Sequence, residues 1–373
     1  MQNGLSVKRL SVFLCVFALC FSLSFPVCAV SLSEVSLEEW PVYENREVTA
    51  DAFIVMEAST GRVLMGKNIH EHLAMASTTK IIGAMMVLEQ PNPDEYFTVD
   101  AQAIQVEGSS MGLQEGDQVS LYALACGMLL PSGNDAANAA GVRLYGSIEG
   151  FVEAMNQRAQ ELGLSDTHYV TACGLDAPDH YSSAFDLAKL TRNALQNEDF
   201  AYICAQSKMQ VRFGNPPYDR WLSNYNQLLE LYPDCIGVKT GFTDDAGRCL
   251  VSAAERDGMT LICVTLDASD DWNLHASLYD ECFDSYSMQP LPSTPASITM
   301  IDPEGGESEL MLQPAWKVSV PLKAGESARL DYTILSEPFT YAPASAGQVY
   351  AQAMYLLDNR PLCQIPLICA DST

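Results

Sequence analysis

Strand-forming segments lie at both ends of residues 50–290, with helix-forming segments between them. Residues 52–57 and 63–68 are apolar, and the Ser59-Thr60-Gly61 turn between them predicts a pair of strands. Strand character returns after residue 235 in three segments: 236–238, 248–254 and 260–266. Asp257-Gly258, between the last two, is a strong hairpin signal. One antiparallel sheet must therefore join distant parts of the chain, which predicts an α+β fold with an inserted helical subdomain.

The segments between these strands have helical character. A helix that begins at Ser77 is followed by the apolar run 81–88, so we expect it to be buried. Residues 95–230 are expected to be largely helical, with four helices: 121–130, 136–145, 148–162 and 183–196. A final helix is expected at 272–287, directly after the last strand of the sheet.

The pattern changes at three closely spaced prolines, which predict a stiff linker: Pro290, Pro292 and Pro295. Beyond them, Gly and Pro turns separate three segments of strand character: 315–322, 328–335 and 349–357. At 373 residues the chain is longer than most single domains. We therefore expect a catalytic-sized domain at 30–288 and a small all-β domain at 297–373.

The N-terminus has the three parts of a secretory signal peptide. Lys8 and Arg9 precede an uncharged apolar run at 10–23, and Val27-Cys28-Ala29 offers small residues at a cleavage site. The apolar run is short for a membrane span, so we favour removal of residues 1–29 over an uncleaved anchor. The expected location is outside the cytoplasm, secreted to the cell wall or periplasm.

The chain is strongly acidic, with 47 Asp and Glu residues, 20 Lys and Arg residues and a formal net charge of −27. Removal of residues 1–29 would take away Lys8 and Arg9, leaving 47 acidic and 18 basic residues and a net charge of −29. This charge disfavours nucleic acid and anionic lipid as partners. Nine cysteines would remain, an odd number without a CxxC pair. We expect most of them to be small buried hydrophobic residues.

The segment Ser77-Thr78-Thr79-Lys80 could bring a nucleophile and a base together. Side chains three residues apart lie on one helical face, so a helix starting at Ser77 would hold its hydroxyl beside the Lys80 amine. A serine hydroxyl is a weak nucleophile unless a base takes its proton, and lysine can do so where burial keeps it neutral. An isolated S-x-x-K match is common by chance, so this segment alone predicts little.

Two later segments carry side chains that could act on a peptide. Ser132-Gly133-Asn134 offers a hydroxyl to relay a proton and an amide to hold a carbonyl, although the same residue types cap helices. Lys239-Thr240-Gly241 offers positive potential, a hydroxyl for a carboxylate and room for a backbone approach. Taken singly, a helix cap and an ordinary strand are the better interpretations.

In this order the three segments form the signature of penicillin-binding proteins and class A β-lactamases, with Gly133 in place of the Asp of S-D-N. Other matching runs surround them: 58–64, 131–137, 180–184, 237–242 and 246–254. Over about residues 45–288 the chain resembles the low-molecular-mass penicillin-binding proteins, the serine-type D-alanyl-D-alanine carboxypeptidases. Its β-rich tail resembles the usual C-terminal domain of that family. The resemblance implies a β-lactamase/transpeptidase-like catalytic domain, with an antiparallel sheet flanked by helices plus a helical subdomain.

The resemblance also implies an activity: removal of the terminal D-alanine from peptidoglycan stem peptides, through an acyl-enzyme and without a cofactor or metal. Ser77 would attack the carbonyl between two D-alanines, and Lys80 would accept its proton. Ser132 would pass that proton toward the leaving amine. β-Lactams would mimic the dipeptide and trap Ser77 as a slowly released ester.

Substrate binding is implied for six further residues: Asn134, Lys239, Thr240, Gly241, Phe242 and Arg248. Asn134 would hold the substrate amide and Thr240 the terminal carboxylate. The backbone N–H groups of Ser77 and Phe242 would hold the oxyanion. Arg248 is the nearest cationic candidate for the carboxylate, because the run at 269–273 lacks an arginine.

Two further features depart from the family pattern. Cys173 stands where the family would have Pro-His, and we expect it at the periphery of the site. The last residues, 369–373, form no basic amphipathic stretch, so we expect no stable membrane anchor.

Three other functions compete with this one. A β-lactamase would need a second base to activate water, and neither Glu161 nor Glu198 lies in a recognisable loop of that kind. A catalytically silent penicillin-binding or wall-binding protein would have no need of the intact three-part signature. A metallopeptidase would rest on His70-Glu71-His72, but no H-E-x-x-H occurs, so we reject it.

Overall fold

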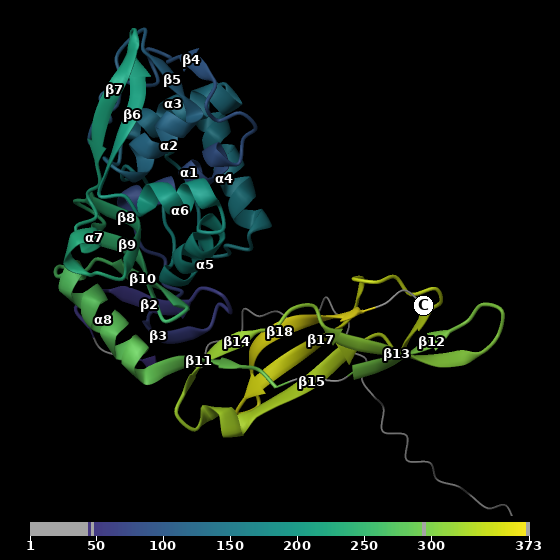
Figure 1. The fold of residues 1–373 in the computed structure, drawn as a ribbon. Helices are drawn as coiled ribbons and strands as arrows, with labels where there is room; N and C mark the ends of the chain where they lie inside the picture. Colours follow the sequence, from purple (N-terminus) through teal and green to yellow (C-terminus); the bar gives the residue numbers. More distant parts are fainter. Residues whose placement is uncertain (1–43, 46–47, 293–295, 371–373) are drawn as a thin grey trace, which may run out of the picture.

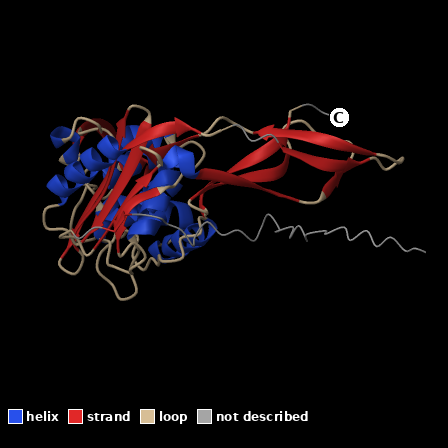
Figure 2. Ribbon diagram, turned by 90° about the horizontal axis from the view of Figure 1, so that it is seen from below, coloured by secondary structure: helices blue, strands red, loops and turns tan. Residues whose placement is uncertain are grey.

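A computed structural model of the protein describes residues 44–45, 48–292 and 296–370. The expected signal peptide at 1–29 lies outside these residues. A larger domain of helices and strands lies beside an elongated β domain (Figure 1), which projects from one end of it (Figure 2). Within the described ranges, no helix is long and apolar enough to cross a membrane.

The sheet that was predicted to join the two ends of the larger domain is present. It has the strand order β1-β3-β2-β10-β9-β8 and is antiparallel except between β1 and β3. The six strands are β1 (Glu44–Asn45), β2 (Ala52–Glu57), β3 (Val63–Lys67), β8 (Cys235–Thr243), β9 (Gly247–Arg256) and β10 (Met259–Leu266). Asp257 and Gly258 have φ angles of 51° and 76° and form the predicted turn. Strand β8 lies at an edge, so it has one neighbour in the sheet.

Both faces of this sheet are covered by packed side chains. Strand β2 shows the arrangement, because successive side chains of a strand point to opposite faces. Ala52, Ile54 and Met56 join one hydrophobic core, and Phe53 and Val55 join another. The first core contains the inserted helices, and the second contains α8 (Asp271–Ser285), which is the predicted final helix.

The four helices predicted within 95–230 are present, each bound lying within two residues of its prediction. They belong to a set of six: α1 (Lys80–Leu88), α2 (Leu121–Leu129), α3 (Asn134–Tyr145), α4 (Ile148–Glu161), α5 (Ala184–Ala194) and α6 (Glu198–Cys204). All nine residues of α1 are buried, as its uninterrupted apolar sequence predicted. A short turn of 3-10 helix, η2 (Ala76–Thr79), leads directly into α1.

The expectation that 95–230 is largely helical was wrong in one respect. A four-stranded sheet stands beside the helices, with the order β4-β5-β6-β7. Its strands are β4 (Tyr96–Thr98), β5 (Gln118–Ser120), β6 (Lys208–Gly214) and β7 (Pro217–Ser223), and α7 (Leu228–Leu231) follows them. Along β6, buried Val211 and Phe213 alternate with exposed Gln210 and Arg212. This period of two is a strand signal that the sequence prediction missed.

The C-terminal part is built of strands around its own hydrophobic core. Six strands form a sheet of order β15-β17-β18-β13-β12-β16, and β11 pairs with β14 in a second. The strands are β11 (Tyr286–Pro290), β12 (Ala296–Ile301), β13 (Glu307–Pro314), β14 (Ser319–Lys323), β15 (Leu330–Ser336), β16 (Phe339–Tyr341), β17 (Val349–Leu357) and β18 (Arg360–Cys369). The three strands predicted there correspond to β14, β15 and β17. Because β11 follows α8 directly, β pairing begins before the proline linker.

A buried ion pair joins the two domains. The Arg62 guanidinium, from the turn before β3, donates to both carboxylate oxygens of Glu326 at 2.9 and 3.1 Å. It also donates to the Pro321 carbonyl and lies 5.2 Å from the centre of the Tyr286 ring. Arg62 is 8% exposed and Glu326 is 7% exposed. The two charges are thus largely withdrawn from water and satisfied by each other.

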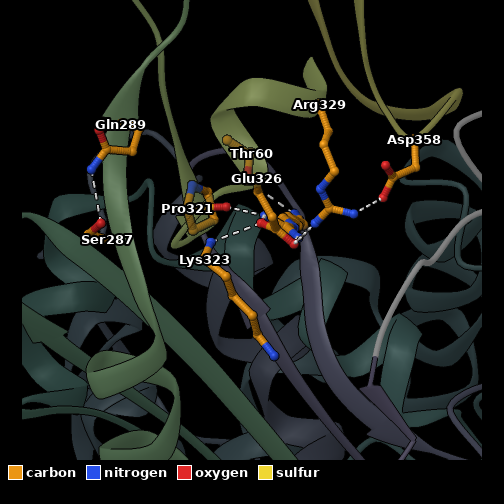
Figure 3. A network of polar contacts seen from close by, with 9 residues as sticks. Thr60, Ser287, Gln289, Pro321, Lys323, Glu326, Arg329 and Asp358 are labelled. Carbon is orange, nitrogen blue, oxygen red and sulfur yellow. Dashed lines mark hydrogen bonds and ion pairs between the residues drawn. The ribbon is translucent and has the colours of Figure 1, made fainter. Parts of the chain in front are cut away.

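Neighbouring groups extend this network along η3 (Glu326–Arg329), as Figure 3 shows. The Lys323 backbone N–H donates to Glu326 at 2.9 Å, and Arg329 pairs with Asp358 nearer the surface. Burial alone would raise the pKa of Glu326, but the bonds from Arg62 and from the Lys323 N–H bring that pKa below its ordinary value. Glu326 is therefore held as a carboxylate at the junction.

Candidate active site

Ser77 and Lys80 are in hydrogen-bond contact, as their spacing predicted. Ser77 lies in η2, and Lys80 is the first residue of α1. The Lys80 Nζ donates to Ser77 Oγ at 2.8 Å and to the Cys173 carbonyl oxygen at 2.6 Å. Ser77 is half-buried, whereas Lys80 is fully buried. A nucleophile open to solvent therefore has an amine directly behind it.

Burial changes the acid–base character of that amine. It lowers the pKa of Lys80 to about 8, against smaller opposing effects from the Cys173 thiol and the Asp135 carboxylate. About one Lys80 in ten is then neutral at pH 7, which is enough to act as a proton acceptor.

A second lysine lies close by on β8. Lys239 is 1% exposed, and its Nζ donates to the Thr240 carbonyl at 2.7 Å. Burial lowers its pKa well below the ordinary value, and the positive charge of Lys80 lowers it further. The third sequence segment is thus brought beside the first.

Gly241 allows β8 to lie close to η2. A Cβ at this position would lie 3.0 Å from the Ala76 Cβ and 3.1 Å from the Ser77 backbone nitrogen. A larger residue would crowd the contact between β8 and η2, and the predicted part of Gly241 in substrate binding stays a prediction. Thr240 is half-buried, and Phe242 exposes 64% of its surface at the rim. The oxyanion role of the Ser77 and Phe242 N–H groups stays a prediction.

Ser132 lies between α2 and α3, Asn134 is the first residue of α3, and the two are 3% and 4% exposed. The Asn134 Nδ2 donates to the Glu107 carbonyl at 2.7 Å, which fixes the orientation of the amide. Its Oδ1 is buried and has no hydrogen-bond partner among the described residues. A buried acceptor without a partner is costly, so this oxygen is available to an N–H group of a ligand.

The position between them is too crowded for a side chain. A Cβ at Gly133 would lie 2.6 Å from Asp135 Oδ1 and 2.8 Å from the Met111 backbone nitrogen. Asp135, which is 2% exposed, accepts hydrogen bonds from the N–H groups of Met111, Gly112 and Leu113 at 2.9, 3.1 and 3.0 Å. The Asp135 carboxylate thus holds the loop that in turn holds Asn134.

Sequence reasoning did not single out Asp135, and it placed Cys173 wrongly. Cys173 is 3% exposed, and its carbonyl binds Lys80, so it lies at the centre of the site and not at the periphery. A backbone carbonyl leaves no trace in the residue type. An acidic residue in the first turn of a helix, such as Asp135, is usually explained by the helix dipole alone.

His180, which belongs to the matching run 180–184, contacts the segment that carries Ser77. Its Nδ1 accepts from the Val170 N–H at 2.9 Å, so Nε2 carries the proton and donates to Thr79 Oγ1 at 2.8 Å. Thr79 in turn donates to the Ala76 carbonyl at 2.8 Å. Burial lowers the pKa of His180 to about 4, which keeps the ring neutral and this chain of bonds intact.

Arg248 lies beside the site but is already engaged. It pairs with Phe242 across β8 and β9. Its Nη2 donates to Asp271 at 2.7 Å, and its guanidinium lies 5.3 Å from the centre of the Trp272 ring. A substrate carboxylate would have to share this cation with Asp271, so the predicted role of Arg248 stays a prediction.

The other groups considered from the sequence lie elsewhere. His70 and His72 contact the same carboxylate, Asp166, at 2.9 and 3.2 Å. In the described part of the chain, no group of three or more His, Cys, Asp or Glu side chains is arranged to hold a metal. Of the nine described cysteines, all are buried except the half-buried Cys235.

Comparison with known proteins agrees with this geometry. Residues 39–270 match the model of the D-alanyl-D-alanine carboxypeptidase family of peptidases. The D-alanyl-D-alanine carboxypeptidase DacF of Bacillus subtilis is 30% identical over 328 residues, covering 85% of this chain and 84% of that protein. DacC of Escherichia coli, with the same description, is 32% identical over 350 residues, covering 88% and 85%.

A solved structure extends the similarity to the β domain. Penicillin-binding protein 5 from Haemophilus influenzae has a TM-score of 0.73 and 25% sequence identity, over 88% of this chain and 98% of that one. The fold is therefore the α+β transpeptidase-like domain followed by an all-β domain, as predicted. On the match of more than half its length to the family model, the chain belongs to the D-alanyl-D-alanine carboxypeptidase family.

Proposed function

We propose that the protein is a serine-type D-Ala-D-Ala carboxypeptidase that removes the terminal D-alanine from peptidoglycan stem peptides. The observation that carries the proposal is the 2.8 Å contact between Ser77 Oγ and a buried lysine whose pKa is about 8. This pair provides a nucleophile and a base that is partly neutral at physiological pH. The action is extracytoplasmic, and secretion through residues 1–29 is part of the proposal.

In the acylation step, neutral Lys80 accepts the proton of Ser77 while Oγ bonds to the carbonyl carbon of the penultimate D-alanine. The carbon–nitrogen bond to the terminal D-alanine then breaks. Ser132 passes a proton to the departing amine, with Lys239 supplying positive potential close by. The products of this step are free D-alanine and an ester on Ser77.

Substrate binding follows from the groups around the nucleophile. The unpartnered Asn134 Oδ1 accepts from a backbone N–H of the stem peptide, since the amide is held by Glu107 in that orientation. The Thr240 hydroxyl binds the terminal carboxylate, and Gly241 gives the backbone room. The Ser77 and Phe242 N–H groups hold the oxyanion, and Arg248 adds positive charge at the rim.

Water completes the cycle by hydrolysing the ester, with Lys80 returning as the base. A β-lactam acylates Ser77 in the same way, but its leaving group stays attached, so the ester persists. Stem peptides ending in D-Ala-D-Ala are the proposed substrate, and β-lactams are the proposed covalent inhibitors.

The β-lactamase alternative lacks support from the acidic residues that were considered for it. Glu161 is bonded to Gln157 and Arg158 on the exposed side of α4. Glu198 is exposed in the first turn of α6. Among the described residues neither is hydrogen-bonded or ion-paired to Ser77, so neither supports rapid hydrolysis of a penicillin ester.

Intact mass spectrometry separates the alternatives. The protein is incubated with a diacyl-D-Ala-D-Ala peptide and, separately, with penicillin. Release of one D-alanine together with a persistent adduct on Ser77 supports the carboxypeptidase. Rapid turnover of penicillin would indicate a β-lactamase, and an adduct without peptide cleavage would indicate a silent binding protein.

The matched variants are Ser77→Ala and Ser287→Ala, the second removing an exposed hydroxyl on β11. Only the first should abolish both the adduct and D-alanine release. Release that survives in Ser77→Ala would contradict the mechanism.

A further inference from the structure

Two cysteines meet where helix α6 ends and strand β8 begins. Cys204 is the last residue of α6, and Cys235 is the first residue of β8. The Cys204 Sγ lies 3.6 Å from the Ile236 carbonyl oxygen, and the Cys235 Sγ lies 3.2 Å from the Gly237 carbonyl oxygen. The two sulfurs therefore contact consecutive peptide units.

Gly237 permits this close packing. A Cβ at Gly237 would lie 2.7 Å from the Cys204 Sγ, nearer than a carbon and a sulfur can approach without displacement. The end of the helix and the start of the strand are thus in direct contact through the Cys204 side chain. The Cys204 side chain therefore lies against the first residues of β8, which begin with Cys235.

The two thiols also influence each other electrostatically. Burial raises the pKa of Cys204 to about 12, and a negative charge on Cys235 raises it further, because like charges at short range repel. Burial likewise raises the pKa of Cys235 to about 11. Both groups are protonated at neutral pH, so their chemistry is slow there and faster in alkaline solution.

A buried amide favours reaction at Cys235. Asn226 is 2% exposed, and among the described residues its Nδ2 has no partner of ordinary hydrogen-bond geometry. The Asn226 amide lies near enough to the Cys235 sulfur to lower the pKa of that thiol, against the larger effect of burial. Cys235 is also half-buried, whereas Cys204 is fully buried. Cys235 is therefore the thiol that an external reagent reaches first.

We propose that Cys204 and Cys235 form a disulfide that joins the end of α6 to the start of β8. The oxidant is a small-molecule disulfide. The Cys235 thiolate displaces one thiolate from it to give a mixed disulfide, and the Cys204 thiolate then displaces the second. The two protons lost by the cysteines pass to the two displaced thiolates, so that two thiols are released for each disulfide formed.

The position of this bond gives it a structural consequence. Strand β8 is an edge strand that contacts α6 at Gly237, and it carries Lys239 four residues after Cys235. The bond would close the loop that contains β6, β7 and α7, which restricts the unfolded chain. It would also tie down the open edge of the strand that carries the Lys239-Thr240-Gly241 segment.

The test uses the full chain, reduced and then incubated with oxidised glutathione at pH 8.5. We expect an intact mass lower by about two mass units, and peptide mapping that joins Cys204 to Cys235. The melting temperature of the oxidised protein should rise by about 5 to 10 °C. Cys204→Ala and Cys235→Ala should prevent both changes, and Cys126→Ala, which removes a buried thiol of α2, should prevent neither.

Two results would overturn the proposal. One is a cross-link between other cysteines, such as the neighbouring buried pair Cys263 and Cys282. The other is a glutathione adduct on Cys235 that does not resolve with Cys204. Release of D-alanine by the reduced protein is measured separately, so a failure of the proposed activity cannot be mistaken for a failure of the disulfide.

Discussion

The two domains place their buried charges for different purposes. In the larger domain Lys80 and Lys239 are at most 1% exposed, Lys80 contacts Ser77, and the charge of Lys80 acts on Lys239. In the described part of the β domain Glu326 is the only buried charged side chain, and its partner Arg62 comes from the other domain. Burying a charge is unfavourable unless the group is paired or shifts its pKa. In the larger domain, burial of a lysine lowers its pKa and so tunes its reactivity. In the β domain, a buried carboxylate pairs with Arg62 and so attaches one domain to the other.

The largest effect is expected when the Lys80 amine that contacts Ser77 is removed. In Lys80→Ala we expect the rate of acylation by a fluorescent penicillin to fall by about a thousandfold, because no base remains to accept the serine proton. The rate is followed by gel fluorescence or stopped flow. Lys208→Ala, which removes an exposed lysine on β6, should acylate at the wild-type rate. Equal rates in the two variants would remove the basis for calling Lys80 the base.

The next largest expected effect is that of pH on the acylation rate. Only the neutral form of Lys80 accepts a proton, so the acylation rate should rise with pH and level off above the pKa of about 8. Between pH 6 and pH 8 the neutral fraction grows about fiftyfold, and the rate should follow it. Thermal unfolding measured over the same range shows whether folding is unchanged. A rate independent of pH in this window would argue against a lysine base.

A smaller effect is expected at Gly133. In Gly133→Ala the new Cβ would collide with Asp135 Oδ1, 2.6 Å away, and displace the loop that orients Asn134. The acylation rate should fall by about tenfold through misplacement of the second segment. Gly146→Ala lies at the other end of α3 and meets nothing within 4 Å, so it should affect stability alone. A normal rate in Gly133→Ala would show that the loop tolerates displacement.

Substitutions in the Arg62–Glu326 pair between the domains should change stability and leave the acylation rate unchanged. Arg62→Ala leaves the Glu326 carboxylate buried without its partner, which should lower the free energy of unfolding by about 3 kcal/mol. Chemical denaturation measures this change. Arg329→Ala removes a half-exposed cation that pairs with Asp358 and lies only 3.8 Å from Glu326, and it should have little effect. The double variant Arg62→Met with Glu326→Leu should recover most of the loss, and failure to recover would show that packing, not charge, dominates.

The stability that the Arg62–Glu326 pair contributes should be lost at acidic pH. Folding lowers the pKa of Glu326 below its ordinary value of 4.5, so its contribution to stability is present above pH 4.5. The contribution is lost as pH falls through the lower pKa of the folded state. Wild type and the Arg62→Met, Glu326→Leu double variant should therefore differ most in their response to acid.

Much of the catalytic architecture could be predicted from the sequence, because its signals are local. The S-x-x-K spacing placed Ser77 against Lys80, and strand patterns at both ends of the domain predicted the sheet. The glycine of the third segment was expected to give a backbone room, and it lies where β8 and η2 approach each other closely. The signature also identified the family, since three ordered segments together are far more specific than any one.

What was missed depends on contacts between distant residues. The Cys173 carbonyl binds Lys80 through a backbone atom that any residue could supply. The Arg62–Glu326 pair joins residues 264 positions apart, and each is an ordinary surface residue by type. The β6–β7 hairpin was overlooked although Val211 and Phe213 alternate with polar residues, because helical patterns on either side dominated the interpretation.

The complete burial of α1 has a consequence for how the protein loses activity. A helix whose nine residues are all inside the core cannot fray or open without disrupting the packing of the whole domain. Its amide hydrogens should therefore exchange with solvent only through global unfolding. The base is the first residue of that helix and the nucleophile lies in the turn of 3-10 helix directly before it, so penicillin labelling reports on the fraction of molecules that remain folded.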